Sequence, residues 1–451
     1  MTFKLYNTYK SRYNCRIYCG QQQVYHPMTL TSHRSYVLQS WFLFGLGALF
    51  FATEYFARVA PAVMVPELMQ SFHVDALAIG TLSAFFYYPY IIMQVPAGLI
   101  YDTLGIQKVL GGMILLCTLG AGLFVVAHTF WLLIIARILI GFSSAFAFTG
   151  ALKIAAVRFP PHKLGLLAGI TQGMGMFGAA LSEEIFGFAM HAVGWRSVML
   201  IITLVLFINA VLIFIFLHDK QLCYTKTSSS PVIHKGKRAL ITVLSNKDGW
   251  INAVYAALGF APTGAFAALW GIPYLQKNYQ LPLHQAAAII SMIFLAWGIT
   301  GPVVGHLSDK MKKRKPLMLA ASASGVISLS SLIYLSNVPL FGLYVLAFIY
   351  GASNCGVSLA YAIATEINPL EASGVSIAFT NMLSIITTPF LQLIIGALLV
   401  FDYHHTQHSI HAPMTYSMHN YHYALFALPL ITLLSFFLVF FIKETHCQRV
   451  T

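Results

Sequence analysis

Charged side chains are scarce in this 451-residue sequence, because Asp, Glu, Lys and Arg together make up only 9% of it. Soluble globular proteins carry roughly 25% charged residues. Hydrophobic residues reach 58%, and the mean hydropathy is +0.75. A water-facing surface cannot be built from this composition, which excludes a soluble globular protein. Stretches without any of the four charged types recur at 76–101, 109–136, 249–276, 278–308 and 316–365.

The motifs of common enzyme classes are also missing. The sequence contains no Gly-x-Ser-x-Gly elbow, no phosphate-cradling Gly-rich loop with Lys and no His-Glu-x-x-His pair. Cysteine is rare, and we expect the six residues to be reduced and unpaired, without a disulfide framework. They stand at positions 15, 19, 117, 223, 355 and 447. We therefore predict that the protein is not an enzyme and needs no cofactor.

The uncharged stretches predict membrane-spanning helices, because one span needs roughly 20 apolar residues. The many alternating strands of an outer-membrane barrel are absent from the sequence. Polar residues, prolines and glycines divide the chain into twelve candidate helices, which predicts an all-α membrane protein. These helices are 37–60, 76–100, 108–128, 130–156, 164–190, 196–217, 250–273, 283–306, 316–336, 339–364, 372–400 and 423–442.

The positive charges fall on alternate sides of the predicted spans. If the N-terminus is cytoplasmic, the only positively charged residues in the predicted outer loops are Arg196 and Lys277. This asymmetry follows the positive-inside rule and requires an even number of spans. We predict a multi-pass protein of the plasma membrane (the inner membrane in bacteria) with both termini cytoplasmic. The net charge of +13 is then a topology signal rather than a sign of nucleic-acid binding. A small-molecule substrate and membrane lipid are the expected partners of a monomer.

A short basic loop occurs twice in the sequence. Residues 305–315 read Gly-His-Leu-Ser-Asp-Lys-Met-Lys-Lys-Arg-Lys, and a weaker copy with Gly98 and Asp102 lies 207 residues earlier. This pattern resembles the signature loop of the major facilitator superfamily, over about residues 36–442. The resemblance implies two six-helix bundles related by a pseudo-repeat. The candidate conformational-switch residues are Gly98, Asp102, Gly105, Lys108, Arg158, Gly305, Asp309, Lys310, Arg314 and Glu366.

The charges at these helix ends have two interpretations. They can form ion pairs that latch the two halves and break when the cavity opens inward, or they can be ordinary solvated helix ends. The predicted organisation is a cytoplasmic segment at 1–35, a bundle at 36–217, a linker at 218–248, a bundle at 249–442 and a tail at 443–451. The first segment lacks the apolar core of a secretory signal, and Met28 is an alternative start.

Two further stretches resemble family motifs. Arg137-x-x-x-Gly141 matches the arginine-glycine motif of the fourth helix, where the glycine permits close helix packing. The fifth helix is rich in glycine between Gly169 and Gly178, like the family helix that packs the two bundles together, although the usual Gly-Pro pair is missing. We interpret these glycines as packing surfaces rather than ligand contacts.

The first predicted helix carries Glu54, Tyr55 and Arg58, and Glu54 and Arg58 share a face. In one interpretation they form a structural salt bridge. In the other, Arg58 and Tyr55 contact an anionic group of the substrate and Glu54 is a protonation site. Arg58 also resembles the first-helix arginine of organophosphate:phosphate antiporters and sugar-phosphate sensors, which carry a second basic residue in the seventh helix. Residues 250–273 contain no Arg, Lys or His, so phosphate substrates rank second.

Other polar groups at membrane depth complete the candidate site. Charges there are costly and are retained mainly for function or tight pairing. Arg137 is a further candidate substrate contact, and Glu183 and Glu184 join Glu54 as candidates for proton coupling. The second half has no ionisable residue deep in a span, so its candidates are neutral. These candidates are Asn252, Trp270, Tyr274, Asn354, Tyr361, Asn381 and Gln392.

A cavity that is charged on one half and polar on the other favours a small anionic or zwitterionic solute. We predict a secondary active transporter that works by alternating access and is coupled to protons or to exchange. The alternatives are a sugar-phosphate or organophosphate antiporter and a non-transporting sensor with the same fold. Six histidines follow the eleventh helix, and we favour a polar loop that senses external pH over a zinc or copper site. They are His404, His405, His408, His411, His419 and His422.

Overall fold

The computed structural model describes the backbone of residues 14–19, 22–27, 30–159, 163–217, 238–369, 372–406 and 416–448. Side chains are described from Val37 onward, apart from isolated positions that include Asp102. Most of the linker predicted at 218–248 and the middle of the histidine-rich loop therefore lie outside the described residues.

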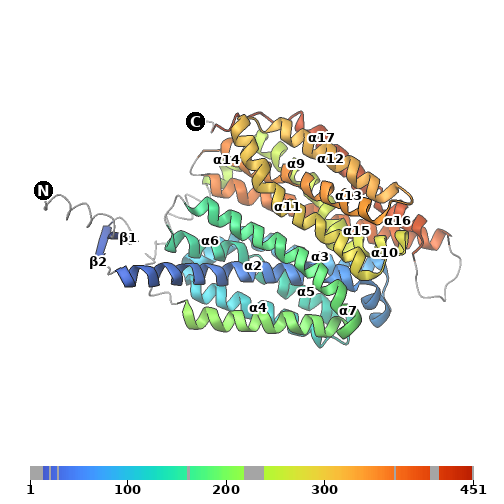
Figure 1. The fold of residues 1–451 in the computed structure, drawn as a ribbon, viewed down its shortest axis with the longest axis horizontal. Coiled ribbons are helices and arrows are strands. Elements are labelled where there is room, and N and C mark those ends of the chain that lie inside the picture. The colour runs from blue at the N-terminus through green and yellow to red at the C-terminus, as the bar shows by residue number, and fades with distance from the viewer. Residues whose placement is uncertain are drawn as a thin grey trace.

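The first half of the chain is helical, as predicted (Figure 1). Its helices are α2 (Leu30–Phe72), α3 (Ala76–Leu104), α4 (Ile106–Val125), α5 (Phe130–Ser144), α6 (Ala147–Arg158) and α7 (Leu164–Phe216). The first helix continues to Phe72 through Pro61 and Pro66, beyond the predicted end at residue 60. Proline is tolerated in a membrane helix because neighbouring groups satisfy the freed backbone atoms.

The second half repeats the helical pattern with more interruptions. Its elements are α9 (Lys247–Ala265), the π-helical turn η3 (Phe266–Trp270), α10 (Gly271–Tyr279), α11 (Leu283–Met311), α12 (Lys315–Tyr334), α13 (Leu340–Ser353), α14 (Cys355–Glu366), α15 (Ser373–Thr406), α16 (Met418–Leu425) and α17 (Ala427–Val439). Three polar residues that precede helices, Asp75, Asn246 and Ser417, act as side-chain caps. Asn246, for example, accepts the backbone N–H groups of Asp248 and Gly249 at the start of α9.

Together these helices make up twelve membrane spans. Among the described residues, eleven helices are long and apolar enough to cross a membrane. The remaining predicted span is the first limb of α7, where Glu183 and Glu184 lower the hydropathy. The limb runs without a gap into the sixth span, and the only non-helical residue inside α7 is Gly194, with φ of 72°. A positive φ is accessible to glycine without steric cost, which explains why the kink lies there.

A small element outside the spans was not predicted. Strands β1 (Asn14–Cys19) and β2 (Gln22–Pro27) pair antiparallel ahead of the first span. Each strand has six residues, which is too short to cross a membrane. The hairpin therefore leaves the all-α architecture of the spanning region unchanged.

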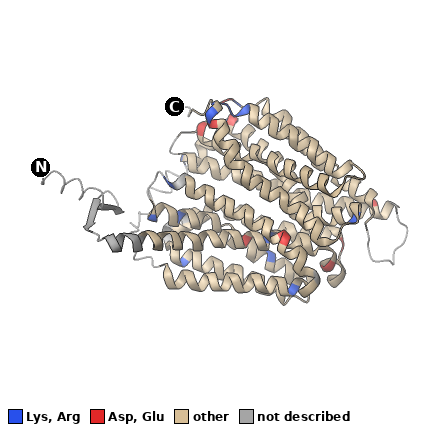
Figure 2. Ribbon diagram, in the orientation of Figure 1, with Lys and Arg blue, Asp and Glu red and all other residues tan. Residues whose placement is uncertain are grey.

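The two halves form two bundles, and α2 begins at the same end of the molecule at which α17 ends (Figure 1). We call this end the basic end, because α6 reaches it at Arg158 and α12 begins there after Arg314; the other end is the distal end. The halves meet where α3 packs on α15 and α7 packs on α11. Figure 2 shows that few charged residues lie between the two ends.

The pseudo-repeat extends to close helix packing. A Cβ atom added to Gly141 of α5 would lie 1.9 Å from the backbone oxygen of Phe86 on α3. In the second half, a Cβ atom on Gly351 of α13 would lie 2.2 Å from the backbone oxygen of Ile293 on α11. Equivalent helices therefore touch through a glycine at equivalent positions in each half.

The halves are in tight contact at the distal end. A Cβ atom on Gly80 of α3 would lie 2.8 Å from the Gln392 carbonyl oxygen of α15, and one on Gly187 of α7 would lie 2.7 Å from the Ala287 Cβ of α11. In the basic-end limbs of the same four helices, an added Cβ atom would meet nothing within 4 Å. These open positions are Gly98, Gly169, Gly173, Gly305 and Gly374. The described halves are thus tightly packed at the distal end, whereas these five glycines have open space beside them at the basic end.

Candidate functional site

Glu54 and Arg58 form a buried ion pair in the middle of α2. The Arg58 Nη2 atom donates to Glu54 Oε1 at 2.8 Å and to Oε2 at 3.1 Å. Glu54 is 0% exposed and Arg58 is 5% exposed. The Nε atom of Arg58 has no hydrogen-bond partner among the described residues. The pair is therefore formed, as one interpretation of the sequence predicted, but the guanidinium keeps a donor for another ligand.

Aromatic rings surround the Arg58 guanidinium. Its carbon atom lies 4.2 Å from the ring centre of Tyr55, 4.7 Å from that of Tyr90 and 5.2 Å from that of Phe86. Aromatic faces attract a cation, more strongly when both are removed from water. Tyr90 also interacts with Gln94, one turn further along α3. The surroundings of Arg58 thus combine cation–π contacts with hydroxyl and amide groups.

Arg137 is engaged by the backbone of α2. Its Nη1 atom donates to the Ala57 carbonyl oxygen at 2.8 Å, and its Nη2 atom donates to the Arg58 carbonyl oxygen at 3.3 Å. The guanidinium lies 4.6 Å from the ring centre of Phe86 and is 1% exposed. Arg137 therefore joins α5 to α2 and holds the helix that carries Arg58. Its Nε atom, like that of Arg58, has no hydrogen-bond partner among the described residues, and its contact with substrate stays a prediction.

The second half places Tyr361 and Asn381 opposite this cluster. The Tyr361 hydroxyl donates to Asn381 Oδ1 at 3.0 Å, and the Asn381 amide donates to Gln94 Oε1 on α3 at 3.2 Å. Tyr361 is close enough to Tyr55 and Tyr90 to interact electrostatically with both. These residues therefore bring polar groups of both halves to the surroundings of Arg58.

The other neutral candidates are fully buried and bonded within the protein. Asn252 donates to the Ala360 carbonyl oxygen, Trp270 to the Gln392 carbonyl oxygen and Tyr274 to the Ile333 carbonyl oxygen. Asn354 accepts from Thr263, and the Gln392 side chain donates to the Gly264 carbonyl oxygen. Because these partners belong to the second half itself, the five residues brace that bundle, and none of these bonds reaches Arg58 or its neighbours on α2.

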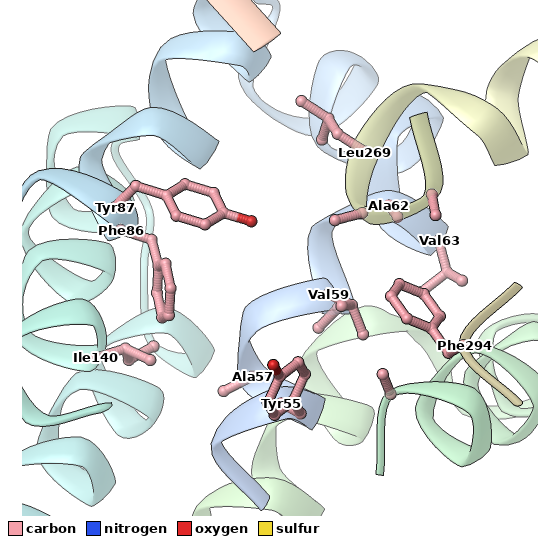
Figure 3. Close-up of a cluster of buried hydrophobic side chains, with 14 of the residues drawn as sticks. Tyr55, Ala57, Val59, Ala62, Val63, Phe86, Tyr87, Ile140, Leu269 and Phe294 are labelled. Carbon is pink, nitrogen blue, oxygen red and sulfur yellow. The ribbon is translucent and has the colours of Figure 1, made fainter. Parts of the chain in front are cut away.

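Figure 3 shows how α2 lies between the two halves. Val59 and Val63 of α2 face Phe294 of α11, while Phe86 and Tyr87 of α3 approach α2 from its other side. Helix α2 also packs on α7, η3 and α10. A change of contact between the halves therefore acts directly on the helix that holds Glu54 and Arg58.

Glu183 and Glu184 have different surroundings. Glu183 is 0% exposed, and neither of its carboxylate oxygens has a hydrogen-bond partner among the described residues. Glu184 is half-buried and lies within electrostatic reach of Tyr344 on α13. Neighbouring positions on a helix point about 100° apart, which explains the contrast.

A cavity of about 1090 Å³ lies at the distal end and is lined by both halves. Its polar lining includes Gln70, His73, Lys277 and Tyr416. The seventh span has cations only near its two ends, Lys247 and Lys277. No group of three metal-ligating side chains occurs among the described residues. Of the six histidines, His408 and His411 lie outside the described part, and His419 Nε2 is 3.9 Å from Asp402 Oδ2.

Comparison with known proteins identifies the family. The model of the Major Facilitator Superfamily matches residues 43–388 and 254–448. The chain belongs to the major facilitator superfamily. The chain is also similar to several named transporters. It is 23% identical to an uncharacterised Bacillus subtilis transporter, YybO, over 59% of this chain and 64% of the relative. It is 23% identical to a probable sulfoacetate transporter of Cupriavidus necator, SauU, over 60% and 65% of the two chains.

A third relative matches over more of its length. The probable galactarate/D-glucarate transporter GudP of Bacillus subtilis is 22% identical over 79% of this chain and 85% of the relative. The chain thus spans about 64% and 65% of the first two relatives and more of the third. The family and these relatives are transporters rather than enzymes.

Solved structures of the superfamily share the fold. A bacterial homologue of the human lysosomal transporter Spinster superposes with a TM-score of 0.71 at 14% identity, over 90% of this chain and 97% of the other. A D-xylose–proton symporter gives 0.70 at 17% identity, over 92% and 100%. These similarities support twelve helices in two bundles, which is the superfamily fold.

The superfamily loop of the second half is organised around Arg314. Its Nη1 atom lies 2.8 Å from Asp309 Oδ1, and its Nη2 atom lies 2.7 Å from Glu366 Oε1. The Ser308 hydroxyl accepts a further bond from Arg314 Nη1 at 2.9 Å. All of these partners belong to the second half. In the described structure, these ion pairs brace α11, α12 and α14 instead of latching one half to the other.

The C-terminal tail joins the same cluster. Glu444 accepts the backbone N–H groups of Arg314 at 2.9 Å and of Lys315 at 3.0 Å. Partial burial raises the pKa of Glu444, but these bonds at the start of α12 outweigh it and hold the pKa below its usual range. The Thr445 hydroxyl donates to Glu366 Oε2. The tail thus caps α12 and supports the Arg314 cluster.

The matching loop of the first half is only partly described. Gly105 has φ of 89° between α3 and α4, a conformation that favours glycine. The side chain of Asp102 lies outside the described residues. Arg158 is buried at the end of α6. Lys108, Lys310 and Gly305 lie at the basic end, where the two lysines are exposed.

Several residues near Arg58 were missed in the sequence. Tyr90 and Gln94 lie one turn apart on α3, and Ser384 contacts Tyr361 at 3.2 Å. Polar side chains four apart in an otherwise apolar span mark one helix face, and this signal was available. The tail residues Glu444 and Thr445 carried no comparable signal, because their contacts join segments far apart in the sequence.

Proposed function

We propose that this chain is a secondary transporter of a small carboxylated anion, which alternates between distal-open and basic-end-open states. The observation that carries the proposal is the buried Arg58, which retains an unpartnered Nε donor at the boundary of the two halves. The names of two relatives, a probable sulfoacetate transporter and a probable galactarate/D-glucarate transporter, support an anionic substrate. Phosphate esters fit less well, because the seventh span lacks a deep second cation.

Coupling to protons follows from the Glu54–Arg58 pair. A substrate carboxylate that binds the Arg58 guanidinium competes with Glu54 for the same donors. The displaced glutamate then loses its cation in a site from which water is excluded, and a proton neutralises it. We assign coupling to Glu54, rather than to Glu183 or Glu184, because Glu54 has an ion pair that substrate can break.

Uptake into proteoliposomes tests the substrate class. Sulfoacetate, glucarate and galacturonate should enter faster than glucose and glucose 6-phosphate. Arg58→Lys keeps the charge but removes the planar fork, so the KM for a carboxylate should rise at least about tenfold. Arg196→Lys is the matched control, because Arg196 donates to the Ala127 carbonyl away from the α2 cluster. Preferential uptake of glucose would contradict the proposal.

Cross-linking tests the alternation. Gln70→Cys and Lys277→Cys line the distal cavity, one from each half, and both native residues are exposed. Gly98→Cys and Gly374→Cys stand on α3 and α15 at the basic end, where an added Cβ atom meets nothing within 4 Å. Linking either pair should stop uptake. Full uptake with both ends linked would exclude alternating access.

Glu54→Gln tests the coupling step. This variant should lose accumulation driven by a pH gradient and keep exchange of substrate across the membrane. Glu184→Gln is the control, because Glu184 is half-buried and forms no ion pair with Arg58 in the described structure. Gradient-driven accumulation that survives in Glu54→Gln would remove Glu54 from the coupling role.

A further inference from the structure

Glu183 lies in the contact between the two halves at the distal end. Met176, Ala180, Glu183 and Gly187 are spaced by four, three and four residues, so they share one face of α7. At one end of this face, the Met176 Cβ lies 3.3 Å from a Cβ atom added to Gly298 of α11. At its other end, Gly187 approaches Ala287 of the same helix. Glu183 therefore faces α11 between these two contacts.

The opposite face of this limb contacts α2 instead. A Cβ atom on Gly178 would lie 2.7 Å from the Ala52 carbonyl oxygen, and Ser182 donates to the Phe56 carbonyl oxygen at 3.5 Å. The first limb of α7 thus has two contact faces: one packs on α2 within the first half, and the other packs on α11 of the second half. The Glu183 carboxyl group belongs to the second surface, which must part if the distal end opens.

Nothing described in this contact balances an ionised carboxylate. Both Glu183 oxygens lack hydrogen-bond partners among the described residues, and the side chain is 0% exposed. The Ser291 hydroxyl of α11 donates to the Ala288 carbonyl oxygen of its own helix. An isolated buried carboxylate is strongly unfavourable, whereas the neutral acid costs much less. The closed distal contact therefore fits the protonated form.

The titratable groups of the surrounding helices do not change this conclusion. On α11 the nearby group is His284, which stacks on Phe188 at 5.2 Å and adjoins Gly187. On α2, Glu54 and Arg58 pair with each other, and the ring of Tyr55 lies against Gly175. Glu184, on α7 itself, lies near Tyr344 of α13. None of them forms an ion pair with Glu183 in the described structure.

We propose that Glu183 is a proton switch for the distal gate: the halves close there when the carboxyl group is protonated and separate when it ionises. The inference rests on the alternating-access part of the proposed function and not on the substrate. The proton enters and leaves Glu183 from the distal side, because the closed contact buries the group. Glu183 therefore sets the pH dependence of gate opening, while proton movement across the membrane remains with Glu54.

The ratio of open to closed protein then depends on pH. Opening releases one proton, so this ratio rises by up to about tenfold per pH unit above the pKa of the hydrated carboxyl group. A Glu183→Gln variant carries a neutral side chain of similar shape at every pH. Its gate should stay mostly closed and lose the pH response.

Spin labels on Gln70→Cys and Lys277→Cys measure the opening directly. The labels are placed in a full-length variant whose native cysteines are replaced by alanine and whose melting temperature is unchanged. Between pH 5 and pH 8, pulsed electron resonance should show a growing long-distance population in the otherwise unmodified protein. Glu183→Gln should show the short distance throughout. The matched control Glu184→Gln should keep the full pH response.

The outcomes separate this inference from the proposed function. A long-distance population that responds to pH equally with and without Glu183→Gln overturns the proton switch and leaves alternating access intact. The same holds for an opening that is present but independent of pH. Absence of a long-distance population at every pH overturns the switch and also contradicts opening of the distal end. The measurement needs no substrate, so a wrong substrate class does not affect it.

Discussion

The two halves join equivalent helices with different chemistry. In the first half, the Arg137 guanidinium of α5 donates to the carbonyl oxygens of Ala57 and Arg58 on α2. In the second half, α9 is hydrogen-bonded to α13 and to the next residue, Asn354, through uncharged groups. Thr263 bonds to the Tyr350 hydroxyl and to Asn354 Oδ1, each at 2.9 Å. The shared fold thus does not require a charge at this junction.

The same contrast extends through the membrane interior. Glu54, Arg58, Arg137 and Glu183 are at most 5% exposed and lie within the spans of the first half. In the described second half, buried charges such as Arg314, Glu366 and Asp402 lie near helix ends. Because a charge at depth is costly, the first half has accepted a cost that the second half avoids. This difference suggests that the first half recognises the charge of the substrate.

The largest effect is expected from removing Arg137. Arg137→Met leaves two carbonyl groups of α2 without their charged donors, each worth about 1.5–3 kcal/mol. We expect a loss of about 3 kcal/mol or more in the free energy of unfolding, measured by denaturation in detergent. Tyr350→Phe removes one neutral bond of the second half and should cost about 1 kcal/mol. Equal losses would show that the charge difference does not matter for stability.

A smaller loss should come from the glycines that the two halves share. Gly141→Ala and Gly351→Ala each push a methyl group against a backbone oxygen, and overpacking of this kind costs about 1–3 kcal/mol. Gly98→Ala is the control, because its Cβ atom meets nothing within 4 Å. Thermal unfolding should show similar losses for the first two variants. A loss confined to one half would contradict the equivalence of the two packing contacts.

A Tyr361 variant tests how much the uncharged side chains of the second half contribute to substrate binding. Tyr361→Phe removes the hydroxyl that donates to Asn381 and contacts Ser384. We expect the KM for a carboxylated substrate to rise several-fold, which corresponds to about 1 kcal/mol. Tyr334→Phe, from a half-exposed tyrosine at the distal end of α12, is the control. A loss as large as that of an Arg58 variant would assign charge recognition to both halves.

The smallest effect concerns the C-terminal tail. Glu444→Gln should lower the melting temperature slightly at pH 7, because its pKa is held below the usual value in the folded protein. A depressed pKa stabilises the fold above the pKa of the unfolded chain, about 4.3, and the effect is lost as pH falls through the folded-state pKa. The difference from the unmodified protein should therefore shrink as pH falls below about 4.3 and vanish below the folded-state pKa. A difference that persists there would point to lost packing instead.

The sequence was sufficient for the architecture, because hydropathy and the duplicated loop depend on local patterns. The Glu54–Arg58 pair was also predictable, since residues four apart on a helix are neighbours. The roles of Arg137 and Asn252 were not, because their partners are backbone carbonyl groups of distant helices. The isolation of Glu183 likewise depends on what α11 presents to it. Helical spacing alone does not contain that information.

A double-mutant cycle of Glu54 and Arg58 tests the central claim, that the first half recognises substrate charge through Arg58. Purified Arg58→Gln, Glu54→Gln and the double variant are reconstituted at equal protein levels, and binding of the best carboxylated substrate is measured. The account predicts weak binding in Arg58→Gln, with no rescue when Glu54→Gln is added and both charges are gone. Normal affinity in the charge-free double variant would show that Arg58 only neutralises Glu54, and would contradict the claim.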